Sequence, residues 1–266
     1  MTHSQLAFEL SGDRTVVRRA LAVAPLRLLT PRNHGTAAWA YTTTLGGGLL
    51  GGDEIALGVS VDRGARALLS SQGSTRAYRS ARQAKVTLEV TLEEGGLLAL
   101  LPDPTACFSG SRVEQRTCVR MAAGASLALV ECVTAGRGAL DGRWALARYR
   151  SALRVADLSG AAVLDETLLL DGAHGPLSAR LGRFDCFATV VLRGPLLAAS
   201  AALALERIAA TPVARDSPLL EAASPIAGGA VIRLAAVSVE AGARRVREVL
   251  SALPLLLGDD PFARRA

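Results

Sequence analysis

Pairs of adjacent carboxylates are the residues of this chain best suited to chemistry, because their oxygens can bind a divalent cation or move a proton. The pairs are Asp53-Glu54, Glu93-Glu94, Asp165-Glu166 and Asp259-Asp260. Adjacent residues of a strand point to opposite faces, so a pair can share one ligand only in a turn. We expect the second and fourth pairs to be solvated turn charges. The other two lie against apolar segments, where a binding role and a structural hydrogen bond both stay open.

Cysteine and histidine form no comparable group in the sequence. The four cysteines contain no C-x-x-C pair, and the three histidines no H-E-x-x-H motif. Isolated cysteines of a cytosolic chain are usually small buried hydrophobes. We therefore expect no tightly bound cofactor and no self-contained zinc or nickel site, although distant ligands can still converge in space. These residues are Cys107, Cys118, Cys132, Cys186, His3, His34 and His174.

A run of glycines at residues 46–52 superficially fits a nucleotide fingerprint. Gly46, Gly48 and Gly51 match G-x-G-x-x-G, but that fingerprint needs a helix to open at the last glycine. The alternation of apolar residues in 55–61 predicts a strand instead. No Lys-Ser/Thr pair follows, as a P-loop requires, so we expect no nucleotide hydrolysis. The glycines predict a tight crossover that sets Asp53 and Glu54 at an internal surface.

Length and composition indicate a globular protein. The chain has 266 residues, half of them apolar, enough for one large β domain or two ordinary ones. The longest apolar runs, such as residues 97–101, are far shorter than the roughly 20 residues that cross a bilayer. Residues 1–20 lack the apolar block of a signal peptide. We expect a cytoplasmic protein with no membrane partner.

The net charge of +6 raises nucleic-acid binding as one alternative. Lys85 is the single lysine, however, and the arginines are scattered along the chain. Aromatic residues make up 4% of the sequence, which leaves few rings for base stacking. We expect no nucleic-acid partner, and the positive charge equally favours acidic protein partners.

Short strands account for most of the chain. Residues 86–92 show the clearest alternation of apolar and polar side chains. Turn residues recur about every 8–12 residues, a spacing typical of a β-sandwich or a wound β structure. Further strands are predicted at residues 5–10, 15–22, 65–71, 97–101, 112–121, 126–133, 144–155, 162–170, 187–192 and 231–239.

Two helices are predicted towards the C-terminus. Residues 198–210 are rich in alanine, and residues 242–253 place their apolar side chains on one face before Pro254 ends the helix. No change of composition divides the chain. The sequence therefore predicts a mainly β fold: a single wound β-sheet or β-sandwich-like domain over residues 1–266, with many short strands and about two helices.

Several motifs then resemble one known family. Residues 44–53 (TLGGGLLGGD) are similar to its G-G-L-x-G-G-D motif, and residues 70–80 (SSQGSTRAYRS) to its T-T-Q-x-(S/T)-x-x-x-Y-R-S segment. Residues 101–115 fit its L-P-x-x-x-x-x-F-x-x-S-x-x-x-Q pattern. Glu131 with Gly136-Arg137 and Gly182-Arg183 with residues 187–189 fit later landmarks. The chain resembles the urease accessory protein UreD family, also called UreH.

The sequence departs from that family in two places. Gly142-Arg143 stands where the family often has Gly-Glu, and residues 261–264 replace a Trp-rich ending. The resemblance still covers about residues 5–260 in the expected order. It implies a nickel-insertion chaperone with no catalytic activity. The implied partners are apo-urease, a helical UreF-like accessory protein and, through that protein, the UreG GTPase.

The resemblance also suggests a role for the polar residues. Nickel passing through a protein would need oxygen and amide ligands that hold it weakly, and few Cys or His side chains that would trap it. For each candidate, a hydrogen-bonded strand end is the alternative. The expected residues of a transient nickel passage are Asp53, Glu54, Ser71, Gln72, Glu131, Asp165 and Glu166. A hydrolase, with a nucleophile and base that meet only in the fold, remains a further alternative.

Overall fold

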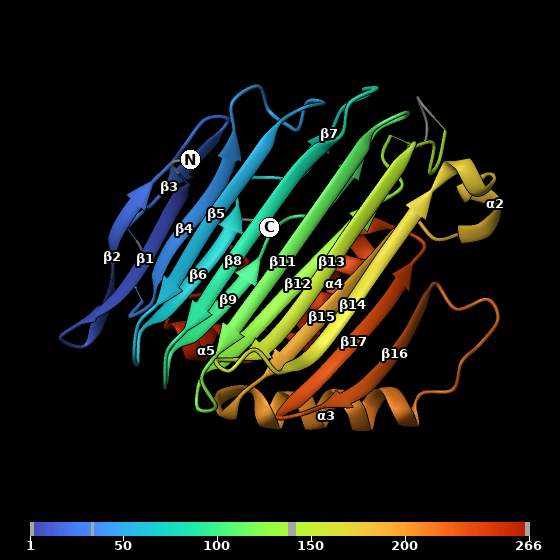
Figure 1. Cartoon of the computed structure of the whole chain (residues 1–266). Helices are drawn as coiled ribbons and strands as arrows, with labels where there is room; N and C mark the ends of the chain where they lie inside the picture. Colours follow the sequence, from blue (N-terminus) through green and yellow to red (C-terminus); the bar gives the residue numbers. More distant parts are fainter. Residues whose placement is uncertain (1–2, 33–34, 138–141, 264–266) are drawn as a thin grey trace.

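Two stacked β-sheets, wound from one path of strands, form the body of the protein (Figure 1). The computed structural model describes residues 3–32, 35–137 and 142–263. His34 and Arg264, which the sequence analysis considered, lie outside these residues. The predicted mainly β, wound fold with few helices is confirmed. No helix in the described ranges is long and apolar enough to cross a membrane.

The first sheet, sheet A, has seven strands. They are β1 Ser4–Ser11, β2 Arg14–Leu21, β5 Glu54–Val61, β8 Ala84–Leu92, β11 Arg112–Met121, β13 Arg148–Asp157 and β14 Ala162–Asp171. Their order is β14-β13-β11-β8-β5-β1-β2. Neighbours from β1 to β13 are parallel, whereas β2 and β14 add antiparallel strands at the two edges. The strands predicted at residues 5–10 and 15–22 correspond to β1 and β2, which pair as an antiparallel hairpin at the start of the chain.

The second sheet, sheet B, has ten strands. Eight form its main path in the order β16-β17-β15-β12-β9-β6-β4-β3. They are β3 Leu26–Leu29, β4 Ala38–Thr44, β6 Arg66–Ser71, β9 Leu97–Leu101, β12 Ser126–Thr134, β15 Cys186–Arg193, β16 Leu219–Ile226 and β17 Gly229–Ala236. The short strands β7 Thr75–Ala77 and β10 Thr105–Cys107 pair with each other, and β10 also pairs with β12.

The longer strands alternate between the two sheets from β4 to β13. They follow one another as β4, β5, β6, β8, β9, β11, β12 and β13, with β4, β6, β9 and β12 in sheet B and the others in sheet A. Each return sets the new strand parallel to its predecessor in the same sheet. The turn at residues 93–96, with Gly95 at positive φ, carries the chain from β8 to β9 in the other sheet. The result is a solenoid-like coil of two layers.

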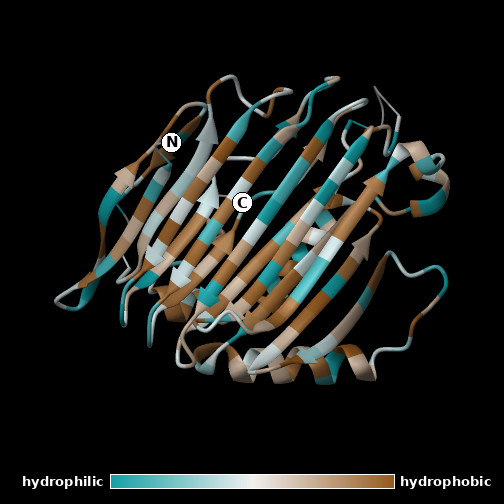
Figure 2. Ribbon diagram, viewed as in Figure 1, coloured by the Kyte–Doolittle hydropathy of each residue, from teal (hydrophilic) through white to brown (hydrophobic). Residues whose placement is uncertain are grey.

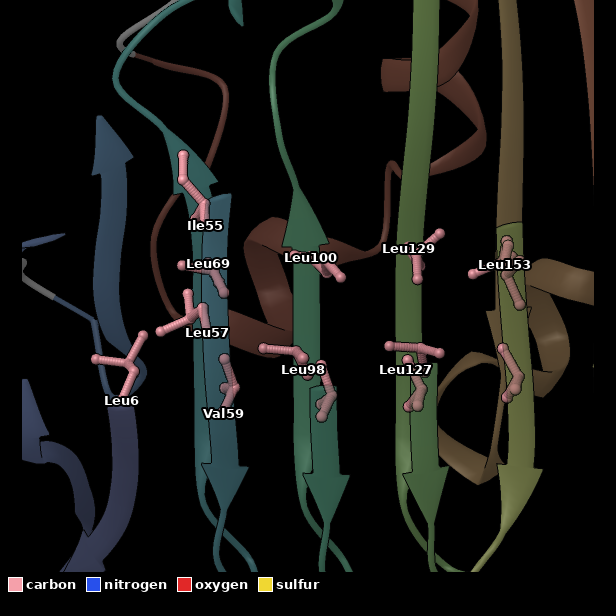
Figure 3. Close-up of a cluster of buried hydrophobic side chains, with 14 of the residues drawn as sticks. Leu6, Ile55, Leu57, Val59, Leu69, Leu98, Leu100, Leu127, Leu129 and Leu153 are labelled. Atoms are coloured by element: carbon pink, nitrogen blue, oxygen red, sulfur yellow. The ribbon is translucent and has the colours of Figure 1, made fainter. Parts of the chain in front are cut away.

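Apolar side chains from both sheets fill the space between them. Hydrophobic and hydrophilic residues alternate along most strands (Figure 2), because successive side chains point to opposite faces. The inward side chains of the two sheets meet in one cluster (Figure 3). Its labelled members are Leu6, Ile55, Leu57, Val59, Leu69, Leu98, Leu100, Leu127, Leu129 and Leu153. A polar residue that points into this layer therefore needs a partner there.

Helices cover the outer face of sheet B, where a second apolar cluster joins them to the strands. α3 Ala198–Ala210 has the predicted bounds. The helix predicted at residues 242–253 begins earlier and divides into α4 Val239–Val249 and α5 Leu253–Leu257. The prediction that Pro254 ends a helix is wrong, because Pro254 lies in the first turn of α5, where no helical N–H is lost. A short additional helix, α2 Leu177–Leu181, follows β14.

Four strands were not predicted from the sequence. β3 lies in the segment after Pro25 that shows no alternation, and β7 and β10 have three residues each. β16 contains Pro225 and lies at the edge of sheet B, where a missing backbone N–H is tolerated. The sequence signal for these strands is weak because their hydrogen bonds come from neighbours that pattern alone does not reveal.

The glycine crossover between β4 and β5 is tightly packed at Gly51. A Cβ there would lie 1.7 Å from Ser80 Oγ and 2.7 Å from the carbonyl oxygen of Arg82. Residue 51 must therefore be glycine because neighbouring atoms occupy the space of a side chain. Three other glycines of this crossover, Gly46, Gly47 and Gly52, have positive φ.

We predict that Gly51→Val lowers the free energy of unfolding by about 1–3 kcal/mol or more, the usual effect of overpacking. Gly73→Val is the matched control, because no atom lies within 4 Å of the Cβ position at Gly73. Denaturant unfolding of both variants measures the difference. Equal stability of the two variants would show that the crossover accommodates a side chain at Gly51.

Candidate functional site

A cavity of about 590 Å³ opens between the two sheets near the glycine crossover. Apolar residues of the inner layer, such as Leu57 and Leu100, form part of its wall. Hydroxyl, amide and carboxylate side chains form the rest, with β4, β6, β11 and β12 all contributing. The polar lining includes Thr42, Thr44, Ser70, Ser71, Gln72, Asp103, Gln115, Thr117 and Glu131.

Glu131 is the carboxylate at the centre of this site. It lies on β12 and points from sheet B towards sheet A. Its Oε1 accepts hydrogen bonds from Gln115 Nε2 at 3.1 Å and Thr117 Oγ1 at 2.7 Å, and its Oε2 accepts one from Ser151 Oγ at 2.6 Å. All three donors are neutral, so they orient the carboxylate and leave its negative charge available to a cation.

The winding of the chain brings these donors together. Gln115 on β11 is directly opposite Ser151 on β13, in a parallel pair of sheet A. Thr117 lies two residues further along β11 and shares its inward face. Thr117 and Ser151 are both almost fully buried, so each hydroxyl depends on a partner in the protein. Glu131 supplies that partner from the opposite sheet.

A second cavity of about 200 Å³ lies on the other side of Glu131. Glu131 and Cys132 border both cavities. The second cavity is also lined by Glu166 on β14 and Arg233 on β17, which form an ion pair between the sheets. Arg233 Nε donates to Glu166 Oε2 at 3.1 Å. The positively charged Arg233 therefore holds Glu166 at this wall, whereas the three donors that hold Glu131 are neutral.

Ser71 and Gln72 lie at the opposite end of the large cavity. Ser71 Oγ donates to Asp103 Oδ2 at 3.2 Å and accepts from the Asp103 N–H at 2.7 Å. These three residues also line a third cavity of about 520 Å³, towards Pro261. The three cavities therefore form a series with shared walls: Asp103 and its neighbours join the third to the first, and Glu131 joins the first to the second.

Three of the predicted residues lie elsewhere. Asp53 Oδ2 accepts from the Leu50 N–H at 2.8 Å and so closes the glycine turn. Glu54 faces solvent with its side chain 73% exposed, beside Lys85. The expectation that the glycines set Glu54 at an internal surface is therefore wrong. Asp165 pairs with Arg154 on the outer face of sheet A, because it alternates with the inward Glu166.

The residues that hold Glu131 were not predicted from the sequence. Thr117 interrupts the inward apolar series of β11 between Val113 and Val119, and Ser151 interrupts that of β13 between Tyr149 and Leu153. Such interruptions were the available signal. They identify inward polar residues but not the strand that faces them, which depends on the winding.

Two thiols and a phenol beside the site have altered ionisation. Cys132 and Cys186 share a hydrogen bond between their sulfur atoms, which are 3.3 Å apart. This hydrogen bond raises the pKa of Cys132, and burial raises it further. The same hydrogen bond lowers the pKa of Cys186, although burial acts in the opposite direction. Burial raises the pKa of Tyr149, and the charge of Glu131 raises it further. Cys107 lies apart, and its burial raises its pKa to about 12. Cys107, Cys132 and Tyr149, whose pKa values are raised, are therefore neutral at physiological pH.

The site offers oxygen and amide donors in place of a closed metal centre. In the described ranges, no group of at least three His, Cys, Asp or Glu side chains could hold a metal ion. Glu131, Gln115 and the hydroxyls supply single, dispersed oxygen atoms along the cavities. Such donors bind first-row metal ions weakly compared with thiolate or imidazole clusters. The arrangement therefore suits transient binding of a small cation better than permanent binding.

Fold and site together define a wound, two-sheet β protein with a series of cavities whose largely apolar walls carry a few polar side chains. Residues 2–266 match the family described as UreD urease accessory protein. The chain therefore belongs to the UreD family, as its motifs predicted.

Curated relatives share this assignment. A protein of Sorangium cellulosum called "Urease accessory protein UreD" is 50% identical over 98% of this chain and 83% of its own length. A protein of the same name from Anaeromyxobacter sp. is 45% identical over 92% of this chain and 82% of its own. "Urease accessory protein D" of Arabidopsis thaliana is 28% identical over 74% and 69%. The similarity to the bacterial relatives thus extends over nearly the whole fold described above.

We predict that Ser151→Ala lowers the free energy of unfolding by about 1.5–3 kcal/mol, because it removes a hydrogen bond to a charged acceptor in the inner layer. Ser251→Ala is the control, since Ser251 is exposed and a surface change of this kind is usually within about 0.5 kcal/mol. Chemical denaturation of the two variants gives the comparison. A Ser151→Ala protein as stable as the control would mean that Glu131 is not held as described.

Proposed function

We propose that this chain is a urease accessory protein that supports the maturation of urease, as a metallochaperone scaffold for nickel insertion and without catalysis of its own. Family membership and the names of its relatives support a role in urease maturation. One observation of the structure carries the nickel role. Glu131 is an inward carboxylate that neutral donors hold between two cavities, and its charge is available to a divalent ion.

In this proposal the nickel ion is cargo that moves through the cavity series. Gln72, Ser71 and Asp103 provide oxygen atoms at one end, Glu131 lies between the two cavities, and Glu166 lines the far wall. Weak oxygen and amide ligands permit both uptake and release of the ion. Because Arg233 neutralises Glu166, the ion would displace that ion pair when it passes. Asp53, Glu54 and Asp165 are left out of the passage, since they face the glycine turn or solvent.

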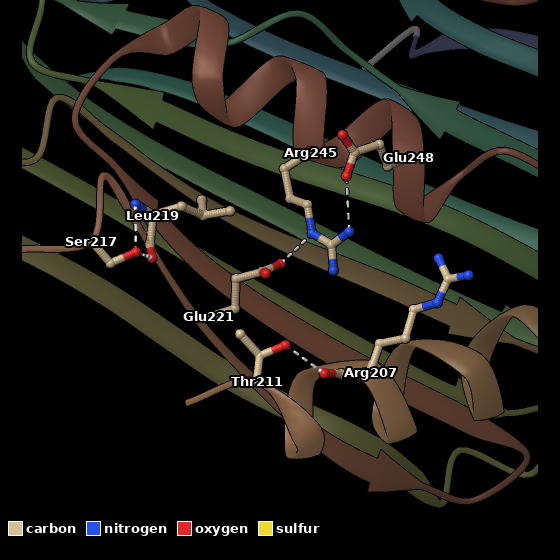
Figure 4. A network of polar contacts seen from close by, with 7 residues as sticks. All are labelled: Arg207, Thr211, Ser217, Leu219, Glu221, Arg245 and Glu248. Carbon is tan, nitrogen blue, oxygen red and sulfur yellow. Dashed lines mark hydrogen bonds and ion pairs between the residues drawn. The ribbon is translucent and has the colours of Figure 1, made fainter. Parts of the chain in front are cut away.

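The proposed partners are apo-urease, a helical UreF-like accessory protein and, through the latter, the UreG GTPase. The C-terminal helices offer an apolar surface for the helical partner. Leu255 on α5 is 85% exposed, a large value for leucine. Arg245 fixes α4 to the edge of sheet B, because its Nε donates to Glu221 Oε1 on β16 at 2.7 Å (Figure 4). Arg245 also bonds Glu248 within α4, so the helix presents a rigid surface.

The passage predicts that Glu131→Gln strongly reduces urease activation in cells while the accessory complex still assembles. Glutamine keeps the size of the side chain and an oxygen acceptor but removes the negative charge that attracts a cation. Asp53→Ala is the matched control, because Asp53 lies outside the cavities and its loss costs only about 1 kcal/mol as a hydrogen bond. Urease activity per assembled complex is the measurement.

Assembly must be followed in parallel, by co-purification of the complex. Normal activation by Glu131→Gln would end the passage proposal. The proposal also fails if Glu131→Gln loses activation only because the complex no longer forms. A loss with Asp53→Ala equal to that with Glu131→Gln would place the ion outside the cavity series.

The partner surface predicts that Leu255→Arg weakens binding of the UreF-like protein at least tenfold, because it sets a charge in an apolar contact. Val213→Arg is the control: Val213 is 78% exposed but lies in the loop between α3 and β16. Both variants should fold like the parent chain, since neither side chain is buried. Titration of the purified partner measures affinity, and equal affinities of the two variants would exclude α5 from the interface.

A further inference from the structure

Three arginines form a row on the outer face of β11, an interior strand of sheet A. Arg112, Arg116 and Arg120 recur every four residues and are all exposed, so they point to the same side of the sheet. At about 3.3 Å per residue, the row is about 26 Å long. Helices α3, α4 and α5 pack on strands of sheet B, so this face of sheet A stays open to solvent (Figure 1).

The carboxylates of this face pair with arginines of the neighbouring strand β13. The three ion pairs, each of 3.2 Å, are Arg148 with Asp171, Arg150 with Glu114, and Arg154 with Asp165. Glu114 lies between Arg112 and Arg116 on β11, but Arg150 donates to its Oε1 and Gln83 to its Oε2. In the part of the chain that the structure describes, the side chains of Arg112, Arg116 and Arg120 therefore have no ion pair or hydrogen bond.

The residues beside the row are small and uncharged. Each of two arginines has a threonine of β8 on one side and an alanine of β13 on the other: Thr87 and Ala152 beside Arg116, Thr91 and Ala156 beside Arg120. Glu89 lies opposite Cys118, between these two arginines, and forms no ion pair with either within the described ranges. Guanidinium groups with short neighbours keep their N–H donors available to another molecule.

Two further arginines extend this basic surface past the start of β8 and β11. Arg79 forms an isolated bridge with Ser111. Its Nε would lie 2.9 Å from a Cβ at Gly110, and the guanidinium carbon of Arg82 would lie 2.7 Å from a Cβ at Gly52. Both arginines are exposed and lie against glycine backbone. Packing therefore positions these two side chains, and their charges stay available as well.

We propose that the outer face of β11, together with Arg79 and Arg82, is a docking surface for an acidic protein. Guanidinium groups bind carboxylates through two parallel hydrogen bonds, so an acidic partner would occupy the donors that this chain leaves open. Charge complementarity of this kind sets the rate of association and the choice of partner.

A nucleic acid fits this surface less well. Glu89, Glu114 and Asp165 place negative charges within the face, where a phosphate backbone would be repelled. The outward side chains of β8, β11 and β13 also include no aromatic ring on which a base could stack. Interspersed charges of both signs are instead suited to a protein surface.

This surface and the helical surface at α5 lie on opposite sides of the two stacked sheets. The chain can therefore bind two proteins at once, a helical one at α5 and an acidic one on sheet A. The natural partner on sheet A rests on the proposed function, in which apo-urease is the second protein that the chain binds directly.

Binding of purified apo-urease to Arg116→Glu/Arg120→Glu tests this surface. We expect the affinity of the parent chain to fall as salt is added, and the double variant to bind about tenfold more weakly than the parent. Arg27→Glu/Arg63→Glu is the matched control, because it makes the same change of charge at two exposed arginines on β3 and in the turn after β5. The control should keep the parent affinity, and circular dichroism verifies that both variants are folded.

The remaining outcomes separate this surface from the other proposals. Equal affinities of the two double variants for apo-urease overturn it. A DNA duplex that binds the parent chain more tightly than apo-urease at the same salt, and is lost with Arg116→Glu/Arg120→Glu, overturns it in favour of nucleic acid. Glu131→Gln and Leu255→Arg should both retain apo-urease, so a failed passage or a failed α5 interface leaves the row intact. A parent chain that does not bind apo-urease at all contradicts the proposed function itself.

Discussion

The hydrogen bonds to Glu131 are the interaction on which the interior of this protein depends. A carboxylate in an apolar layer is costly unless its oxygens are satisfied, and here three neutral donors from sheet A reach one residue of sheet B. These bonds join the two layers at a point where leucine packing is interrupted by cavities. They also keep the charge in the interior, because no donor among them is a cation. Structure and the proposed function therefore rely on the same contacts.

The wound topology assembles this set of donors. Gln115 and Ser151 are 36 positions apart in the chain and lie side by side because β11 and β13 are parallel neighbours. Between them the chain crosses to sheet B as β12 and places Glu131 opposite both. A hairpin would instead have paired residues close in sequence within one sheet. Each coil thus supplies strands to both walls of the cavity, and the donors and the acceptor come from successive crossings.

Local pattern predicted much of the fold and little of the site. The alternation in residues 86–92 places β8 correctly, because its inward face is apolar. Residues 112–121 also form the predicted strand, although Gln115 and Thr117 interrupt the inward apolar series of β11. The prediction from Pro254 was wrong because proline, which interrupts a helix, is also common in the first turn of a new one. Asp165-Glu166 was found as a pair, yet its members face solvent and cavity respectively. The residues that donate hydrogen bonds to Glu131 could not be predicted from the sequence. Period-two alternation shows which residues of a strand share a face, but it does not show which strand of the other sheet lies opposite them.

Strand β12 separates two kinds of donor by the same alternation. Glu131 points into the layer between the sheets, and Cys132 points towards the helices. A single strand therefore presents oxygen to one compartment and sulfur to the other, although the residues are adjacent. Were both on one face, a thiolate next to the carboxylate would bind nickel strongly and oppose its release. The pleat of β12 keeps the weak oxygen donors apart from the strong sulfur donors, and this separation is what a passage for a transient ion requires.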